Sequence, residues 1–179
     1  MIAMTAEREQ PVLHTERLLL RPRTLEDVGA NLAMDLDPRV HRYILAKAPD
    51  AEPWRARLAA QIASGWPPTG GIWVVERQSE PGFLGWCGLF PLGHSGLIEI
   101  GYRYVPAAWG RGIASEAAGV VLEHGFRALA LDAIVAVTHP DNRASQRVLQ
   151  KIGLRPSGEA FYYGQWLRFF RLTRAQYLT

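Results

Sequence analysis

Three strand-like runs follow one another closely in the middle of the chain, and this succession constrains the fold more than any other feature. They cover residues 71–77, 83–92 and 97–105, and the separators at 79–82 and 93–96 are short and rich in turn-forming residues. Strand-like runs joined by such short turns pair as antiparallel neighbours. The sequence therefore predicts an antiparallel meander.

Helical and strand-like segments flank the meander. The stretch 37–53 has three prolines and no clear period, which indicates a flexible, substrate-facing segment. The resulting order, β-α-α-β-β-β-α-β-α-β-β, is typical of a mixed α/β single domain. The flanking strands are expected at 17–23, 133–137, 159–163 and 167–173, and the helices at 24–36, 53–64, from 113 to about 129, and from a cap at Asp141 or Asn142 to Ile152.

Length and composition agree with one domain. The chain has 179 residues, of which 48% are apolar and 21% charged, as in ordinary globular proteins. We expect a loose leader at 1–12 and a single domain at 13–179. Neither a membrane-length apolar segment nor a basic-then-apolar signal pattern is seen, which predicts a cytoplasmic protein without a membrane partner. The one cysteine, Cys87, lies in an apolar run, so it is expected in the core, and no metal site is expected.

Positive charge is concentrated near the C-terminus. The formal net charge is +3, but residues 143–179 hold seven basic side chains against one acidic side chain, Glu159, and so carry a local net charge of +6. This asymmetry favours an anionic ligand beside the last third of the chain, although solvated surfaces produce similar biases.

A glycine-containing loop joins the last strand of the meander to the next helix. Gly110 and Gly112 permit close approach to a ligand, and the N–H groups at the start of the helix attract anions such as pyrophosphate. A Walker A loop is excluded, because neither Lys47 nor Lys151 follows a glycine and precedes Ser or Thr. A dinucleotide-binding loop is disfavoured, because Ser115 stands where that fingerprint needs its third Gly or Ala.

The segment WGRGIASEA resembles motif A of the GNAT superfamily of N-acetyltransferases, with Trp109, Gly112 and Ala114 in the defining positions. Three more segments, in the same order along the chain, are similar to the RimJ/RimL-like branch: HTERLLLRP at 14–22, IEIGYRYVP at 98–106 and HPDNRASQRVLQKIGL at 139–154. The resemblance covers roughly residues 13–175 and implies a single-domain GNAT fold.

The resemblance implies transfer of an acetyl group from acetyl-coenzyme A to a primary amine. Val105 is expected to pair with the pantetheine arm and to offer its N–H to the thioester oxygen, and Asn142 to bond the pantetheine or phosphate region. Arg147 and Lys151 are alternative ligands for the remaining phosphate. The residues whose backbone amides are expected to bind the pyrophosphate are Arg111, Gly112, Ile113, Ala114 and Ser115.

Two side chains are candidates for proton transfer. Glu99 shares a strand face with Arg103 and Val105 and lies six residues before Val105, a spacing similar to that of family members with a glutamate base. Its alternative role is a surface carboxylate or a partner of Arg103. Ser145, three residues after Asn142, corresponds to the proposed hydrogen-bond donor to the leaving thiolate, or else it bonds its own helix backbone.

The expected reaction is direct attack by the amine in a ternary complex, without a metal ion or a covalent enzyme intermediate. The acceptor, either a protein N-terminus or a small-molecule amine, is left open, as is a homodimer. The alternative function is a non-catalytic coenzyme A-binding regulatory or interaction module. Nucleic-acid binding is disfavoured, because strand alternation accounts for the aromatic residues near the basic C-terminus.

Overall fold

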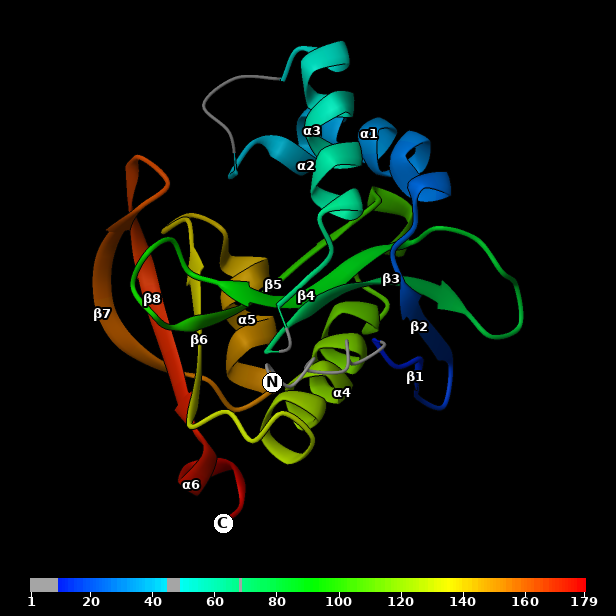
Figure 1. The fold of residues 1–179 in the computed structure, drawn as a ribbon. Helices are drawn as coiled ribbons and strands as arrows, with labels where there is room; N and C mark the ends of the chain where they lie inside the picture. The colour runs from blue at the N-terminus through cyan, green and yellow to red at the C-terminus, as the bar shows by residue number, and fades with distance from the viewer. Residues whose placement is uncertain (1–9, 45–48, 68) are drawn as a thin grey trace, which may run out of the picture.

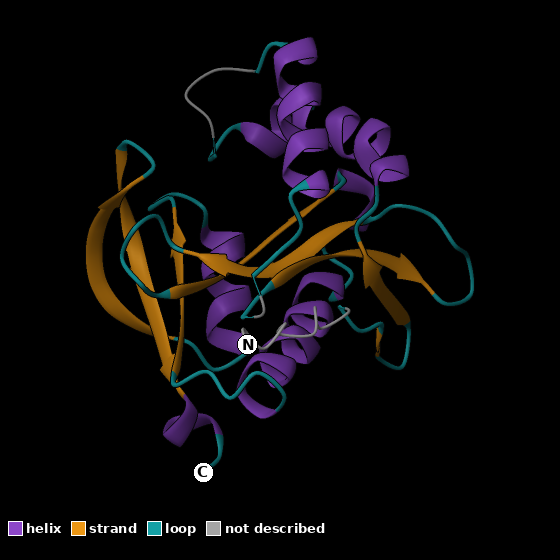
Figure 2. Cartoon of the chain, in the orientation of Figure 1, coloured by secondary structure: helices purple, strands orange, loops and turns teal. Residues whose placement is uncertain are grey.

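A single eight-stranded sheet with helices on both faces organises the chain (Figures 1 and 2). The computed structural model describes residues 10–44, 49–67 and 69–179. The strand order is β1-β2-β3-β4-β5-β6-β8-β7. The strands are β1 Leu13–His14, β2 Leu18–Pro22, β3 Gly71–Arg77, β4 Gly85–Pro91, β5 Ile98–Tyr104, β6 Ala133–Thr138, β7 Arg155–Tyr162 and β8 Gln165–Thr173. The α-helices are α1 Val28–Leu36, α2 Pro38–His41, α3 Ala51–Ala63, α4 Ile113–Arg127, α5 Arg143–Lys151 and α6 Arg174–Tyr177.

The central meander is confirmed. Strands β3, β4 and β5 pair antiparallel in sequence order, with Trp73 opposite Cys87 and Cys87 opposite Tyr102. Cys87 is fully buried, which confirms its place in the core, and burial raises the pKa of its thiol. The sequence order of elements thus corresponds to neighbours in space for the first five strands.

The one parallel pair in the sheet, β5 with β6, separates soon after it begins. Only Ile98 with Ile134 and Glu99 with Val135 are in register, although β5 continues to Tyr104 and β6 to Thr138. An unpaired strand edge presents free N–H and C=O groups to any ligand that lies along it. The sheet therefore has an opening at its centre that begins next to Glu99.

The two faces of the sheet are covered by different helices (Figure 1). Helix α4 packs against β4 and β5, because its apolar residues recur at helical spacing and bury Val121, Leu122 and Phe126 in the main core. Helix α5 packs beside it. On the opposite face, α1 and α3 form a smaller apolar cluster around Val28, Leu32 and Leu58.

Several boundaries differ from the expectation. Helices α2 and α6 have four residues each, too few to produce a periodic pattern. Strand β7 begins at Arg155 rather than 159, because a bulge between Pro156 and Glu159 accommodates the proline and glycine there. Residues 1–9 of the predicted leader and 45–48 of the predicted flexible segment lie outside the described residues. Gln10 and Pro11 are not loose, since they accept or donate hydrogen bonds at β3.

Candidate active site

The opening between β5 and β6 has a polar group on each face of the sheet. Along β5, Glu99 and Arg103 point toward α1–α3, while Tyr102 and Tyr104 point toward α4 and α5. The two faces of the sheet at this opening therefore carry different groups. Glu99 lies on one face, and the helix α4 that follows the glycine loop covers the other.

Glu99 is a buried carboxyl group with a raised pKa. The residue is 6% exposed, and burial raises the pKa of its carboxyl to about 7, although two hydrogen bonds oppose this shift. The Tyr163 hydroxyl donates to Glu99 Oε2 over 2.7 Å, and the Val137 backbone N–H donates the second bond. A carboxyl group that titrates near neutrality can accept a proton from an amine and release it again.

Arg103 is not the partner of Glu99. Its Nη1 donates to Asp35 Oδ1 at 2.5 Å, and Asp35 is 1% exposed. Asp35 also accepts hydrogen bonds from Asn31 and Trp54, so the ion pair joins α1 and α3 to the sheet. Among the described residues, no cation lies within ion-pair distance of Glu99. This leaves desolvation as the dominant influence on its charge.

Aromatic rings cover the sheet between Glu99 and Arg103. The Phe90 ring lies directly over Gly101, where an added Cβ would come within 2.6 Å of the ring. Trp86 and Trp66 extend this surface, with ring centroids 6.2 and 6.5 Å from that of Phe90. The face of the sheet beside Glu99 thus carries an aromatic surface, and the position of the Phe90 ring requires glycine at position 101.

Ser145 lies on the other face, at the first turn of α5. Its backbone N–H donates to Asn142 Oδ1, which confirms Asn142 as the helix cap, and its Oγ is 3.1 Å from the Tyr102 hydroxyl. Burial raises the pKa of Tyr102, so its phenol stays protonated. Sequence reasoning missed Tyr102. The signal was its place on the strand face opposite Glu99, but its partner lies 43 residues away.

The loop before α4 presents unpaired backbone donors. Gly110 and Gly112 have φ values of 71° and 77°, in the left-handed region, and Gly112 caps the helix. None of the five backbone N–H groups from Arg111 to Ser115 donates to an acceptor among the described residues. Such a cluster at the start of a 15-residue helix suits a pyrophosphate.

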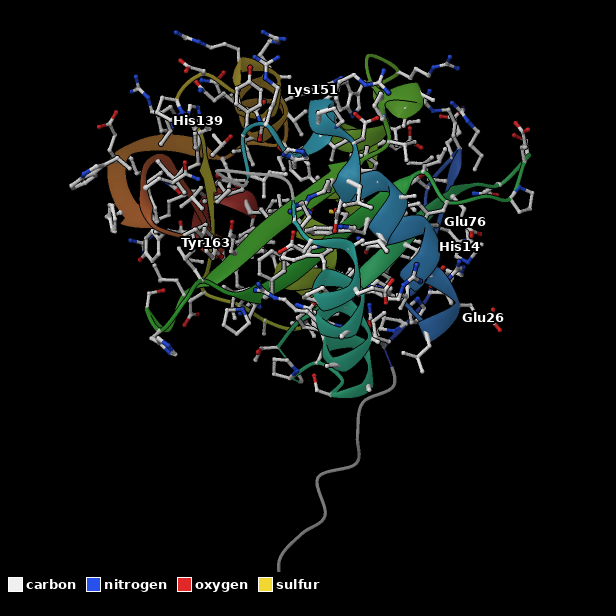
Figure 3. All side chains as sticks on the ribbon, turned by 90° about the horizontal axis from the view of Figure 1, so that it is seen from above. His14, Glu26, Glu76, His139, Lys151 and Tyr163 are labelled. Atoms are coloured by element: carbon white, nitrogen blue, oxygen red, sulfur yellow. The ribbon has the colours of Figure 1, made fainter. Side chains whose placement is uncertain are left out.

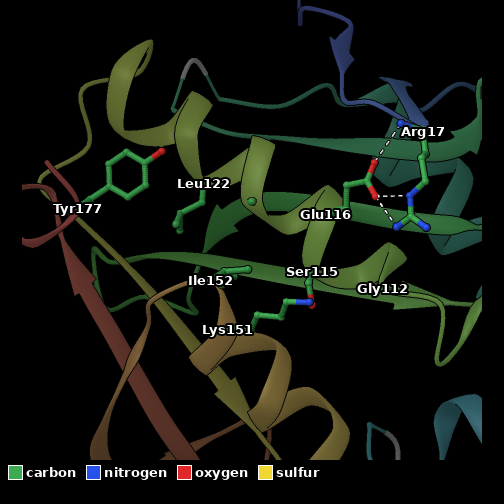
Figure 4. Close-up of a pocket in the computed structure, with 9 residues that line it drawn as sticks. Arg17, Gly112, Ser115, Glu116, Leu122, Lys151, Ile152 and Tyr177 are labelled. Carbon is green, nitrogen blue, oxygen red and sulfur yellow. Dashed lines mark hydrogen bonds and ion pairs between the residues drawn. The ribbon is translucent and has the colours of Figure 1, made fainter.

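A clamp formed by Arg17, Thr15 and Glu116 holds this loop, and Figure 4 shows the contacts between Arg17 and Glu116. Arg17 Nε donates to Glu116 Oε2 over 2.7 Å, and its Nη2 donates to the Arg111 carbonyl over 3.3 Å. Burial raises the pKa of Glu116, but bonds from Thr15 and Arg17 outweigh it and lower the pKa. The clamp therefore pairs the Glu116 carboxylate, which would otherwise repel phosphate, with the Arg17 guanidinium.

We expect Arg17→Ala to raise the KM for acetyl-coenzyme A roughly tenfold, with little change in kcat. The variant frees the Glu116 carboxylate beside the loop and removes the bond to the Arg111 carbonyl; a loss of about 1.4 kcal/mol in binding corresponds to this factor. Initial-rate kinetics at varied coenzyme concentration measure it. Arg127→Ala, which breaks the exposed Arg127–Glu123 pair on the same helix, is the matched control and should leave KM unchanged. An unchanged KM in Arg17→Ala would contradict the role of the clamp.

A pocket of about 410 Å³ lies beside the clamp, between the start of α4 and the end of α5. Lys151 lines it together with Ser115, and Figure 4 shows the lysine side chain extending toward the start of α4. Arg147 is not among the lining residues, so the geometry favours Lys151 over Arg147 as a phosphate ligand. Arg143, Arg147 and Lys151 recur every fourth residue along exposed positions of α5, which makes this helix surface basic.

The expectation for the Val105 N–H is wrong. This group donates to the Leu84 carbonyl over 2.9 Å, and so it points toward β4 and away from the opening. In an extended strand, successive N–H groups point to opposite edges. The N–H groups of Tyr102 and Tyr104 therefore face the β6 side. Trp109 marks this edge, because its indole N–H donates to the Tyr104 carbonyl over 2.9 Å.

No group of three or more potential metal-binding side chains is present in the part of the chain that the structure describes. Among the same residues, no helix has the length and apolar character needed to cross a membrane. The site is a split sheet with a buried carboxyl group on one face and, on the other, a glycine loop whose backbone N–H groups have no acceptor among the described residues.

Comparison with known proteins decides the family. The model of the acetyltransferase (GNAT) domain matches residues 17–155. The chain belongs to the GNAT acetyltransferase family. It is 34% identical over 150 residues to an uncharacterised N-acetyltransferase, YoaA, of Bacillus subtilis, and the match covers 83% of this chain and 85% of YoaA. This GNAT domain is therefore an acyltransferase.

Solved structures support the GNAT fold. A GNAT-family acetyltransferase from Bacillus anthracis is 25% identical, with a TM-score of 0.78 over 92% of this chain and 99% of that protein. RimJ of Mycobacterium smegmatis, in complex with CoA-disulfide, is 24% identical, with a TM-score of 0.68 over 87% of this chain and 81% of RimJ. The second likeness concerns the fold only. The predicted mixed α/β GNAT fold is confirmed.

Proposed function

We propose that this chain transfers the acetyl group of acetyl-coenzyme A to a primary amine by direct attack, in the manner of the RimJ/RimL-like branch. The observation that carries the proposal is Glu99, a buried carboxyl group with a pKa near 7 at the point where β5 and β6 separate. A carboxylate at this position can accept the proton that a neutral amine loses as it attacks the thioester. A cytoplasmic location remains a prediction.

The residues that would hold acetyl-coenzyme A fit it. The free N–H groups of Arg111, Gly112, Ile113, Ala114 and Ser115 suit the pyrophosphate, and Lys151 suits a further phosphate. Bound there, the coenzyme supplies an activated acetyl thioester. The unpaired edge of β5 offers backbone groups to its pantetheine arm, with Val105 at the end of that edge. The oxygen of Asn142 is used as a helix cap, so only its amide NH₂ remains for the coenzyme.

Each remaining chemical task has a candidate group in this chain. Glu99 accepts the proton that the amine releases. The backbone N–H of Tyr104, which faces the opening, replaces that of Val105 as the donor to the thioester oxygen as negative charge develops there. Ser145 Oγ, bonded to the Tyr102 hydroxyl, donates a hydrogen bond to the sulfur that leaves. The carbon–nitrogen bond forms first, and the carbon–sulfur bond then breaks with the sulfur leaving as a thiolate. The proton of the amine passes to Glu99 and on to water, and the thiolate takes up a proton from water to give the free thiol.

We expect the rate of acetylation to rise with pH through about 7. Glu99 accepts a proton only as a carboxylate, so activity is present above the raised pKa and lost below it, about tenfold per pH unit. The measurement is kcat/KM between pH 5.5 and 9. Deprotonation of the acceptor amine raises kcat/KM further at higher pH. Glu99→Gln should keep this second rise but lose the rise near pH 7. A limb near pH 4.5 would show an ordinary, solvated carboxyl group and contradict this assignment.

The proposed activity is tested by thiol release from acetyl-coenzyme A across a panel of primary amines. The panel includes peptides with free N-termini, polyamines, amino acids and aminoglycosides, and mass spectrometry confirms the acetylated product. We expect amine-dependent thiol release with at least one class. Tight binding of coenzyme A without transfer to any amine would support the non-catalytic coenzyme-binding module instead.

A further inference from the structure

The turn between β7 and β8 places a tyrosine against the buried carboxyl group. Tyr162 pairs with Gln165, so Tyr163 and Gly164 are the two central residues of a tight hairpin turn. Figure 3 labels Tyr163 on the same flank of the molecule as His139, which follows the end of β6. The Tyr163 hydroxyl reaches Glu99 Oε2, although the two residues are 64 positions apart in the sequence.

The backbone at Tyr163 is unfavourable for a tyrosine. Its φ is 53°, and that of Gly164 is 78°, so both central residues lie in the left-handed region. Two-residue hairpin turns with two positive φ values favour Asn-Gly, because a Cβ is crowded there. A strained residue persists only where the surrounding structure holds it, and such residues concentrate at functional sites.

The exposure of the two side chains differs sharply. Tyr163 is 59% exposed, whereas Glu99 is 6% exposed. The phenol is the one side-chain donor to Glu99 among the described residues, and it connects the buried carboxyl group to the surface. Burial and the neighbouring carboxylate raise the pKa of Tyr163, so the phenol remains a donor throughout the working pH range.

We propose that Tyr163 is a positioning residue for Glu99, whose hydroxyl fixes the carboxylate at the opening between β5 and β6 and stabilises its ionised form. The inference rests on the proposed role of Glu99 as the base. The hydrogen bond occupies one carboxylate oxygen, and this leaves lone pairs free for the acceptor amine or its water. Loss of the donor makes ionisation of the buried group harder.

Among the described residues, no other charged or titratable side chain around Glu99 forms an ion pair or a hydrogen bond with it. Strand β6 has no titratable side chain between Ala133 and Thr138. Arg103 and Asp35 pair with each other, and Arg168 and Glu159 pair on the hairpin. Tyr162 lies beside Tyr163, and the His139 ring lies against Tyr43. Arg171 of β8, whose register partner on β7 is Arg155, lies on the same face of the sheet as Glu99, but β6 lies between the two. Cys87 and Tyr102 lie on the opposite face of the sheet.

Two variants separate the positioning role from a structural one. Tyr163→Phe removes only the hydroxyl. Tyr163→Asn also removes it, but it places in the turn a residue that tolerates a positive φ, so its melting temperature should equal or exceed that of the wild type. We expect the acidic limb of kcat/KM to move upward by about one pH unit in both variants, with the KM for acetyl-coenzyme A unchanged. Tyr162→Phe, which alters the neighbouring phenol, is the matched control and should leave the limb in place.

A titration without turnover makes the test independent of the proposed function. Carboxyl ¹³C NMR of glutamate-labelled protein follows Glu99, whose signal is assigned by its loss in Glu99→Gln. We expect a midpoint near 7 in the wild type and a higher midpoint in Tyr163→Phe. An equal midpoint in both proteins overturns the inference about Tyr163. If the midpoint is higher in Tyr163→Phe although the wild type acetylates no amine, the role of Tyr163 is supported and the proposed function is wrong.

Discussion

Glu99→Gln is expected to lower kcat/KM for the acceptor amine by a factor on the order of 100 to 10,000, the usual contribution of a positioned general base. Glutamine keeps the shape of the side chain but cannot accept the proton of the amine. Glu99 is 6% exposed at the point where β5 and β6 separate, so bulk water is poorly placed to substitute for it. Steady-state kinetics at pH 8, with the coenzyme saturating, measure the loss.

Binding and stability measurements exclude trivial causes of this loss. The loop before α4, which we propose binds coenzyme A, lies on the other face of the sheet, so the affinity for coenzyme A should be unchanged. The raised pKa means that Glu99 contributes stability below its unfolded pKa of about 4.5 and loses it as pH rises through about 7. At pH 8 the buried charge is unfavourable, and Glu99→Gln should melt no lower than the wild type. Full activity in this variant would remove Glu99 from the mechanism.

Gly112→Val is expected to raise the KM for acetyl-coenzyme A on the order of 100-fold, the equivalent of losing one or two charge-assisted hydrogen bonds. A β-branched residue is strongly disfavoured at a φ of 77°, so the loop must change conformation and redirect its N–H groups. The side chain would also enter the pocket that Gly112 lines, where an added Cβ is already 3.4 Å from Arg17 Nη2.

The control is Gly158, which also has a positive φ, so that valine is disfavoured there too. Gly158 has a φ of 95° in β7, at the opposite edge of the sheet, and an added Cβ there has no neighbour within 4 Å. Gly158→Val should lower the melting temperature without a change in the KM for the coenzyme. Calorimetric titration with coenzyme A distinguishes the two variants directly. Equal affinities would show that the loop amides do not hold the coenzyme.

Local patterns predict much of this fold because the elements concerned have strong periodicity and clear ends. The strand 71–77 has the expected bounds, and α5 is capped by Asn142, one of the two residues that the sequence offers for this position. Alternation along the strand also places Glu99 and Arg103 on one face, as the structure has them. These features depend on residues a few positions apart, which a single sequence contains.

The errors concern contacts between distant segments. The Val105 N–H was assigned to the wrong edge of its strand. Alternation along a strand gives the face of each side chain, but the partner of an N–H depends on which strand lies at each edge. Arg103 bonds Asp35, 68 residues away, and Glu99 bonds Tyr163, 64 residues away. No local pattern specifies either partner. The sequence places Tyr163 at the end of a strand, with the turn one residue later than the observed Tyr163–Gly164 turn, and it does not show the carboxyl group that the Tyr163 phenol meets.

The most direct test of the account is a single-turnover reaction with an excess of protein over [¹³C]acetyl-coenzyme A, in the presence of a reactive amine from the panel. Mass spectrometry of the quenched mixture follows the label on coenzyme, amine and protein. Direct attack predicts that the label passes to the amine as free thiol appears, with no labelled protein at any time and a slower rate in Glu99→Gln. Labelled protein that forms and decays before the product, or coenzyme that keeps its label, would contradict the account.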